Sequence, residues 1–366
     1  MNDVLLKNLI SDGFSKARAL YYLQCLENER KSGYFDEQYM KWAHSHGFKA
    51  WTLKMYGVEL GDNIDNYISD YEYNRLHPLN SWEKIWVNDK LTLKMILNGT
   101  KLSDIMPKYY YYASPRGMIS LSDNPFGASF DNFIQCLIHA HKFACKPNNG
   151  TRSLGFFVLS HENGAFYYND TQISKQELKA IIDQHPNYLY TEYLLPNDFW
   201  AAYSPLVHTF RINILNENGD NPFVYASHLR LPSSKCQACN RVNYENEAEA
   251  NLYIQIDTET AYMQNATLCY RDHFENPHTH PDTNAPLNVY AEGYKECETV
   301  ALEISSMLPN LEWLGFDLAV TSQGIKLMEI NTLGDHTVDQ IGKPAKNNKR
   351  IAEWFAKKAM ERHKRG

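Results

Sequence analysis

The sequence predicts an α+β fold, in which helices and mainly antiparallel strands occupy separate stretches of one chain. Residues 1–85 carry apolar side chains at helical spacing. Beyond Pro205, short apolar runs alternate with turn sequences, which is typical of antiparallel strands. The chain has 366 residues, of which 43% are hydrophobic and 13% aromatic, so it can bury the cores of two or three folding units.

Charge and apolar patterning exclude several classes of protein. The 36 Lys and Arg residues against 43 Asp and Glu give a net charge of −7, which argues against a general nucleic-acid binder. No apolar run approaches the roughly 18 residues of a membrane span, and the N-terminal residues lack the pattern of a signal peptide. The seven cysteines are therefore expected to be mostly reduced and buried. We expect a cytoplasmic protein with no membrane span and no nucleic-acid partner.

The region 1–85 is predicted to be helical. Ser15 can cap a helix that Gly33 closes, and its apolar stripe consists of Ala19, Leu20, Leu23 and Leu26. A second helix is expected over 36–47. The simplest role for this region is packing, and its sequence does not indicate a specific chemistry.

Helices and strands are mixed over 86–194. Asp89 can begin a helix that Gly99 ends, and Ser129 can begin another. Asn163-Gly164 is a strong hairpin signal, and Ser174 with Glu177 forms a capping box. The expected strands are 109–112, 142–146, 156–159, 165–168 and 188–194.

From Pro205 onward the chain is predicted to be mostly antiparallel β. The expected strands are 207–215, 222–231, 252–257, 261–270, 312–321 and 325–330, the last two forming a hairpin. Long helices are expected over 291–307 and 345–363.

The last hairpin carries a group of oxygen ligands. Side chains alternate along a strand, so Glu329 and Asn331 project from one face, and hairpin pairing can bring Asp317 alongside. Two carboxylates and an amide oxygen suit Mg²⁺, which completes its coordination with water and phosphate oxygens. A solvent-exposed polar face is the alternative, and the hairpin taken alone favours it slightly.

Two lysines and a glycine-bearing loop form a second group. Lys90 lies at a helix start and Lys146 at the end of an apolar strand, where a point charge can meet phosphate. The loop 148–155 follows, and Gly150 with Gly155 allows tight turns. It is not a P-loop, since GxxxxGK[ST] is absent. An ordinary hairpin turn is the alternative for this loop.

Two further segments complete the candidate chemistry. Where the strand ending at Leu194 leaves its sheet, exposed backbone groups can meet an adenine edge, although a simple turn is the alternative. Arg211 falls inside an apolar strand, and a buried arginine needs a partner. Phosphate and a structural carboxylate are equally good candidates for that partner.

The order of these motifs is more informative than any one of them. From the N-terminus they are Asn88-Asp-Lys90, Lys146-Pro147 with the loop, Glu192-Tyr-Leu194, Arg211, and Asp317 followed by Glu329-x-Asn331. This order resembles the ATP-grasp superfamily, which includes D-alanine–D-alanine ligase. It is most similar to the sugar-transfer-associated ATP-grasp family, found with capsule and polysaccharide genes. The resemblance covers roughly 35–345, including His278-Thr-His280-Pro-Asp282 and Asn331-Thr-Leu-Gly-Asp335.

The resemblance implies an ATP-grasp fold, in which two α+β subdomains grip ATP. Lys90 and Lys146 would bind the α- and β-phosphates, and the loop 148–155 would close over them. The implied loop contacts are Gly150, Thr151, Arg152 and Ser153.

The adenine and the metals would be bound by other segments. The resemblance implies that Glu192 and the backbone from Tyr193 to Leu195 hold the adenine, with Asp198 on the ribose. The implied ligands of two Mg²⁺ ions are Asp317, Glu329 and Asn331.

One departure from the family pattern concerns the catalytic arginine. D-alanine ligases place an arginine two residues before the metal aspartate, and here that position is Gly315. Arg211 or Arg230 would have to supply this charge to the transferring phosphoryl group.

The resemblance implies four segments and an activity. The segments are a helical N-terminal region (1–85), two ATP-grasp subdomains (86–190 and 191–345) and a basic C-terminal helix (346–366). The activity is that of an ADP-forming carboxylate–amine ligase that works through an acyl phosphate in polysaccharide or glycan modification. A kinase acting on a glycan precursor or small metabolite is the alternative, and a non-catalytic binding module is a third hypothesis. The ligase substrate would be a small molecule or glycan precursor with a carboxylate and an amine, and a homodimer is one candidate assembly.

Three side signals remain open. His280, Asp282 and Asp335 can line the acceptor site, with polar loop positions as the alternative. The C-terminal helix can pack on the core or touch a membrane surface. A Cys₃His zinc site has suitable spacing, but a lone C-x-x-C is often incidental, so we expect no zinc. Its four residues would be Cys236, Cys239, Cys269 and His273.

Overall fold

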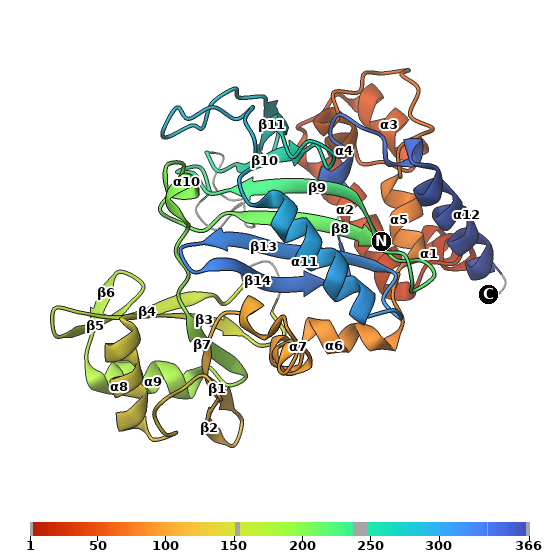
Figure 1. The fold of residues 1–366 in the computed structure, drawn as a ribbon. Coiled ribbons are helices and arrows are strands. Elements are labelled where there is room, and N and C mark those ends of the chain that lie inside the picture. The colour runs from red at the N-terminus through yellow and green to blue at the C-terminus, as the bar shows by residue number, and fades with distance from the viewer. Residues whose placement is uncertain (1–2, 151–153, 237–247, 335, 364–366) are drawn as a thin grey trace. The chain divides into compact units, whose positions relative to one another are not determined.

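The computed structural model describes residues 3–150, 154–236, 248–334 and 336–363, which form two compact units (Figure 1). The first unit consists of Met1–Lys84, His208–Asp317 and Ile330–Gly366. The second consists of Ile85–Val207 and Leu318–Glu329. Helices and antiparallel strands occur in both units, which confirms the α+β class.

The first unit contains helices and one sheet. The helices are α1 (Asp3–Ser11), α2 (Lys16–Ser32), α3 (Glu37–Ser45), α4 (Ala50–Met55), α5 (Asp70–Leu76), α11 (Tyr294–Met307) and α12 (Lys349–His363). Short 3₁₀ turns are η1 (Trp82–Lys84), η3 (Val338–Gln340) and η4 (Ala345–Asn347).

The sheet of the first unit has the strand order β12-β11-β10-β9-β8-β13-β14. Its strands are β8 (Thr209–Leu215), β9 (Phe223–Leu231), β10 (Asn251–Ile256), β11 (Met263–Cys269), β12 (Phe274–Glu275), β13 (Trp313–Thr321) and β14 (Gly324–Asn331). The segment Leu318–Glu329, which holds the end of β13 and most of β14, belongs to the second unit, so this hairpin supplies residues to both.

The two faces of this sheet differ in character. On β8, Phe210 and its alternate neighbours are fully buried, and α11 lies across that face, with Tyr294 packed edge-on against Phe210 at 5.6 Å (Figure 1). The intervening residues, Arg211 and Asn213, point to the other face because side chains alternate along a strand. In the antiparallel register Arg211 is opposite His228, so both lie on this second, polar face.

The N-terminal helices begin and end as their sequence predicts. Ser15 accepts a hydrogen bond from the N–H of Arg18 at the start of α2, and Gly33 ends it in the left-handed conformation. The buried residues of α2 are Ala19, Tyr22, Leu26 and Glu29, whereas Leu20 and Leu23 are only partly buried. The buried stripe is therefore shifted from the predicted one, and it includes a carboxylate.

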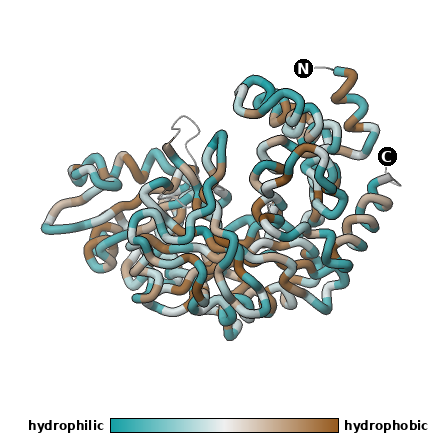
Figure 2. Tube along the Cα trace, turned by 90° about the horizontal axis from the view of Figure 1, so that it is seen from above, coloured by the Kyte–Doolittle hydropathy of each residue, from teal (hydrophilic) through white to brown (hydrophobic). Residues whose placement is uncertain are grey.

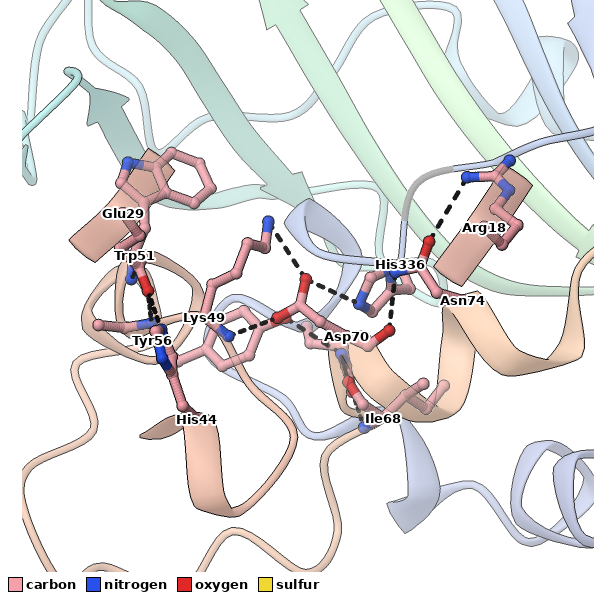
Figure 3. A network of polar contacts seen from close by, with 12 residues as sticks. Arg18, Glu29, His44, Lys49, Trp51, Tyr56, Ile68, Asp70, Asn74 and His336 are labelled. Atoms are coloured by element: carbon pink, nitrogen blue, oxygen red, sulfur yellow. Dashed lines mark hydrogen bonds and ion pairs between the residues drawn. The ribbon is translucent and has the colours of Figure 1, made fainter. Parts of the chain in front are cut away.

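Glu29 is buried because it holds the start of α4 (Figure 3). Its carboxylate accepts hydrogen bonds from the backbone N–H of Ala50 at 2.8 Å and of Trp51 at 2.9 Å, and contacts His44 Nε2 at 2.7 Å. These contacts satisfy two N–H groups of the first helical turn, which have no partner within the helix.

A second polar group ties the N-terminal region to the segment after β14 (Figure 3). Asp70 accepts from the Lys49 backbone N–H at 2.9 Å and lies 3.8 Å from His336 Nε2. The side chain of Gln340 accepts from the N–H of Ile68 at 2.7 Å and donates to the Ile68 carbonyl at 3.0 Å. The side chain of Gln340 in η3 is thus paired with both backbone groups of Ile68, which lies just before α5.

The second unit is built on another seven-stranded antiparallel sheet, with the order β2-β1-β7-β3-β4-β5-β6. Its strands are β1 (Tyr109–Ser114), β2 (Gly117–Ser120), β3 (Lys142–Pro147), β4 (Phe157–Glu162), β5 (Ala165–Tyr168), β6 (Thr171–Ile173) and β7 (Tyr188–Glu192). Its helices are α6 (Ile85–Asn88), α7 (Lys90–Leu97), α8 (Phe130–Ala140), α9 (Lys175–Gln184) and α10 (Asp198–Ala201), with the 3₁₀ turn η2 (Ser103–Ile105).

Local signals in the second unit match the structure closely. Ser174 and Glu177 form the capping box of α9. Asn163 and Gly164 both have positive φ at the β4–β5 turn, as a tight hairpin requires. The core packs Phe133 and Phe143 against Tyr190, and all three are fully buried.

The C-terminal helix α12 packs on the core of the first unit. Ile351, Trp354 and Phe355 are buried, and Trp354 stacks on Trp313 at 5.0 Å. Hydrophobic and hydrophilic residues alternate over short intervals along the trace (Figure 2). Among the described parts of the chain, none of the helices is long and apolar enough to cross a bilayer.

Candidate active site

Lys90 lies at the first position of α7 in the second unit. The N-cap Asp89 accepts from the N–H of Thr92 at 2.8 Å and so fixes this helix start. The side chain of Lys90 is buried; its Nζ donates to the carbonyl of Gly150 at 2.8 Å and lies 3.4 Å from Glu329 Oε2. A predicted phosphate ligand and a predicted metal ligand are thus neighbours in the second unit.

Lys146 lies near the end of β3 and is partly buried. Its Nζ is 5.7 Å from the ring centre of Tyr109, a favourable cation–π distance. Burial, together with repulsion from Lys90, lowers the pKa of Lys146 to about 8, and Glu329 opposes this shift. The surroundings of Lys146 therefore disfavour its charged form, chiefly through burial.

The start of the loop 148–155 is fixed to the first turn of α7. The carbonyl of Asn148 accepts from the N–H of Lys90 at 3.2 Å, and its side-chain oxygen accepts from the N–H of Leu91 at 2.9 Å. Its amide donates to Asp89 at 2.6 Å. At Gly150 a Cβ atom would come within 2.9 Å of Pro147 Cβ, so a glycine suits this tight approach. Thr151, Arg152 and Ser153 lie outside the described residues.

The predicted adenine-binding segment follows β7. Glu192 is buried; its backbone N–H donates to the carbonyl of Lys108 at 2.8 Å, and its carboxylate accepts from the N–H of Lys108 at 3.2 Å. The carbonyl of Leu195 accepts from the N–H of Ser322 at 3.0 Å, so that carbonyl is already paired within the unit. Tyr193 lies 5.9 Å from Lys142 Nζ, and Asp198 is the first residue of α10. The nucleotide contacts of these residues stay predictions.

The polar face of the first unit carries a compact charged group. Arg211 donates two hydrogen bonds to Asp317, from Nε to Oδ1 at 2.5 Å and from Nη2 to Oδ2 at 2.9 Å. Arg230 Nη1 lies 3.7 Å from the same carboxylate, and Asn331 Nδ2 donates to it at 3.1 Å. The partner of the buried Arg211 in this structure is therefore a carboxylate.

The three predicted metal ligands fall in two groups. Asp317 and Asn331 are in contact within the first unit, whereas Glu329 belongs to the second, beside Lys90. Within the described ranges, no three His, Cys, Asp or Glu side chains are grouped so that they could hold a metal ion. An Mg²⁺ ion would rely on phosphate and water oxygens as well.

Gly315 has a structural reason to be glycine. A Cβ atom here would lie 2.7 Å from Asn213 Oδ1 and 3.1 Å from Arg211 Cδ. An arginine at this position would collide with Asn213 and with Arg211, which holds Asp317. Arg211 and Arg230 approach Asp317 from neighbouring strands instead.

A second acidic centre on the polar face was not among the predicted site residues. Asp339, in η3, is buried and accepts from Asn213 Nδ2 at 2.7 Å and from Tyr225 Oη at 3.3 Å. His228 Nδ1 lies 3.0 Å from Asp339 Oδ1. Burial, with repulsion from Arg230 and Arg211, lowers the pKa of His228 well below its usual value, so this imidazole is neutral. The polar residues that alternate with apolar ones in the two predicted strands, at His228 and Arg230 and at Arg211 and Asn213, were the sequence pattern that could have indicated this polar face.

The residues proposed for the acceptor site have structural contacts. His280 is fully buried, and its Nε2 lies 2.9 Å from the carbonyl of Pro232. Asp282 accepts from the backbone N–H of Ser234 at 2.7 Å and from its hydroxyl. These contacts fix 278–282 to the end of β9. Asp335 lies outside the described residues.

The suggested zinc ligands are incompletely described. Cys236 and Cys269 are buried, His273 pairs with Asp272 at 2.8 Å, and Cys239 lies outside the described residues. No zinc ligand set follows from these contacts.

Solved structures that align with this chain have titles that name a synthetase or a ligase. D-alanyl-alanine synthetase A from Vibrio cholerae matches 75% of this chain and 65% of its own, with 14% identity and a TM-score of 0.43. An L-amino acid ligase from Bacillus licheniformis matches 72% of this chain and 48% of its own, with 10% identity and a TM-score of 0.35. The chain thus spans less than two thirds of the length of either.

A third structure aligns over more of its length. The Chryseobacterium gregarium RiPP-associated ATP-grasp ligase, in complex with ADP and a leader and core peptide, matches 89% of this chain and 71% of its own. Its identity is 11% and its TM-score 0.39. No curated protein sequence matches the chain.

A family model matches most of the sequence. The model for sugar-transfer associated ATP-grasp proteins aligns with residues 72–352, which include the two lysines, both arginines and the predicted metal ligands. The chain therefore belongs to the sugar-transfer associated ATP-grasp family.

Proposed function

We propose that this protein is an ATP-dependent, ADP-forming ligase that joins a carboxylate to an amine through an acyl phosphate, in the modification of a surface polysaccharide or its precursor. The family description supports the link to sugar transfer. The observation that carries the proposal is the contact between Lys90 and Glu329, 3.4 Å apart in the second unit. A phosphate-binding cation next to a metal-binding carboxylate is what a magnesium–nucleotide complex needs.

In this proposal the second unit binds the phosphates of ATP. Lys90 is held beside Gly150 at the start of α7, and Lys146 is a partly buried cation with a lowered pKa. The polyphosphate of ATP would neutralise both lysine cations. Because the protein has already removed part of the water around these cations, their attraction to phosphate is stronger than in water. Glu192, the backbone from Tyr193 to Leu195, and Asp198 are the proposed adenine and ribose contacts.

The first unit supplies the remaining electrostatic groups. Asp317 and Asn331 carry hard oxygen donors of the kind that Mg²⁺ prefers, and Asn331 donates its N–H to Asp317, so its amide oxygen would be the atom left to bind a metal. Bound Mg²⁺ would neutralise charge on the transferring phosphate oxygens. Arg211 and Arg230 would stabilise the negative charge of the phosphoryl group as it moves to the substrate carboxylate.

The test is ³¹P NMR of the purified protein with Mg-ATP and pooled amino acids, sugar acids and amino sugars. ADP and free phosphate that appear only when a carboxylate and an amine are both present would establish the ligase. A new organic phosphate signal without free phosphate would establish the alternative kinase. Binding of Mg-ATP without turnover would favour a binding module.

Two lysines of one strand provide a matched control. Lys146→Met is expected to lower ATP turnover at least a hundredfold, because the phosphate loses a preorganised cation. Lys142, also on β3, is exposed and pairs with Glu162 at 3.1 Å, so Lys142→Met should leave turnover unchanged. Equal losses in both variants would contradict the phosphate-binding role.

A further inference from the structure

His228 has an unusual arrangement on the polar face of the first unit. The ring is fully buried on β9, and its Nδ1 lies 3.0 Å from Asp339 Oδ1. Its Nε2 has no hydrogen-bond partner among the residues that the structure describes. A buried polar atom without a partner is costly and is rarely kept without a use.

Asp339 fixes the tautomer of this imidazole. The carboxylate accepts hydrogen bonds only, so the proton of the neutral ring is on Nδ1 and the lone pair is on Nε2. Asn213 and Tyr225 donate to the same carboxylate and hold it in place. A histidine oriented by a carboxylate, with Nε2 left as an acceptor, is the arrangement of a general base.

The surroundings of His228 connect it to the phosphoryl-transfer groups. Arg211 is its cross-strand neighbour on β8, and Arg230 is two residues further on β9, on the same face. From β10, the ring of Tyr253 packs edge-on at 5.6 Å and is itself partly exposed. The ionisable groups that face His228 are thus Arg211, Arg230, Asp339, Tyr225 and Tyr253.

We propose that His228, oriented by Asp339, is the general base that accepts a proton from the amine in the second half of the reaction. This inference rests on the proposed ligase function. Because the ring is fully buried, the amine can reach Nε2 only after a neighbour such as the partly exposed Tyr253 moves. The lowered pKa keeps the imidazole neutral in the protein without substrate, and the ring becomes a stronger base when the negative phosphate of the acyl phosphate offsets the charge of Arg211 and Arg230.

In this step an acyl phosphate reacts with an amine. The amine nitrogen forms a bond to the acyl carbon, and the bond from that carbon to the phosphate oxygen breaks with its electron pair on phosphate. The proton lost by the nitrogen moves to His228 Nε2, and Asp339 stabilises the imidazolium that results. The departing phosphate then takes this proton and restores the neutral ring.

The experiment compares two nucleophiles with the full-length protein. Mg-ATP and the pooled carboxylates are supplied either with the pooled amines or with hydroxylamine, which is largely unprotonated at neutral pH and needs no base. Hydroxamate and amide are measured separately. For His228→Asn and Asp339→Asn, we expect amide formation to fall on the order of a hundredfold more than hydroxamate formation.

Hydroxamate formation also reports that each variant is folded and still makes the acyl phosphate. The matched control is His273→Asn, which removes an exposed histidine paired with Asp272 at 2.8 Å and should change neither product. Equal losses of both products would show that His228 has a merely structural role. Unchanged amide formation would show that His228 has no role in the reaction. Either result overturns this inference alone. A wild-type protein that makes neither product overturns the proposed function, and this inference with it.

Discussion

Arg211 and Asp317 form a two-pronged ion pair on the polar face of the first unit, with Nε–Oδ1 at 2.5 Å and Nη2–Oδ2 at 2.9 Å. Both side chains are almost completely buried. The pair joins β8 to β13, and it brings one proposed catalytic arginine to one proposed metal ligand. The same contact therefore serves stability and, in our proposal, phosphoryl transfer.

Removing one partner of this pair should destabilise the protein. For Arg211→Met we expect a loss of about 3 kcal/mol in the free energy of unfolding, because the buried charge of Asp317 loses the two hydrogen bonds that Arg211 donates to it. Arg211→Met with Asp317→Asn should recover at least half of that loss, since the charge is gone. Urea unfolding measures both. The partly exposed pair of Arg350 and Glu217 is the control, and Arg350→Met should cost only ~1 kcal/mol.

The local structure was predictable because its determinants lie within a few residues. Ser15, Asp89 and Ser174 each accept from a backbone N–H of the helix that they precede, as their position in the sequence predicts. The Asn163-Gly164 turn needs positive φ, which these residues tolerate. The boundaries of most strands therefore fall within two or three residues of the predicted ones.

The polar centre around Asp339 was not predictable in the same way. Asp339 meets His228 and Asn213, which are more than a hundred residues away in the sequence. Only the register of β8 on β9 brings those two side chains to one face, and the sequence does not fix that register. Likewise, Glu29 is buried because it accepts hydrogen bonds from backbone N–H groups of α4. Every residue except proline has such a group, so the side-chain pattern of the sequence does not reveal this contact.

The Glu29 contacts predict a strong effect on the N-terminal region (Figure 3). Glu29→Ala leaves the N–H groups of Ala50 and Trp51 buried without an acceptor, so the free energy of unfolding should fall by about 2–3 kcal/mol. Denaturant unfolding gives this value. Glu37→Ala is the control, since Glu37 pairs with Lys41 on the exposed side of α3 and should have no measurable effect. A similar loss in both variants would mean that the contacts of Glu29 are not responsible.

Gly315 should not tolerate a side chain. In Gly315→Ala the new methyl group would meet Asn213 Oδ1 at 2.7 Å, so Asn213 must move away from Asp339. We expect a loss of roughly 1–3 kcal/mol in the free energy of unfolding, which is typical of overpacking. Urea unfolding tests this, and an unchanged midpoint would contradict the close approach.

Glu329→Gln tests the proposed metal site. The variant keeps the shape of the side chain but removes the charge that a divalent cation needs, so ATP turnover should fall at least a hundredfold. The concentration of Mg²⁺ that gives half-maximal turnover should rise if residual activity permits its measurement. The control is Glu303→Gln, which makes the same chemical change in helix α11 and should keep full ATP turnover. Full turnover in Glu329→Gln would refute the assignment.

Lys146 should make stability depend on pH in a defined direction. Its pKa is about 8 in the folded chain against an ordinary value of 10.5, so the unfolded chain binds more protons between these two values. Stability must therefore rise with pH across this window, because the folded state no longer keeps a poorly solvated cation. The measurement is the free energy of unfolding of the wild type against Lys146→Met from pH ~7 to ~11. Lys146→Met should lack this rise, whereas Lys142→Met, at an exposed position of the same strand, should keep it.

Two neighbours of Lys146 should shift the pH at which stability begins to rise. Glu329 raises the pKa of Lys146, so in Glu329→Gln the rise should begin at lower pH. Lys90 lowers that pKa, so in Lys90→Met the rise should begin at higher pH. A wild-type curve parallel to that of Lys146→Met would show that Lys146 is solvated and would remove the physical basis for its role in binding phosphate.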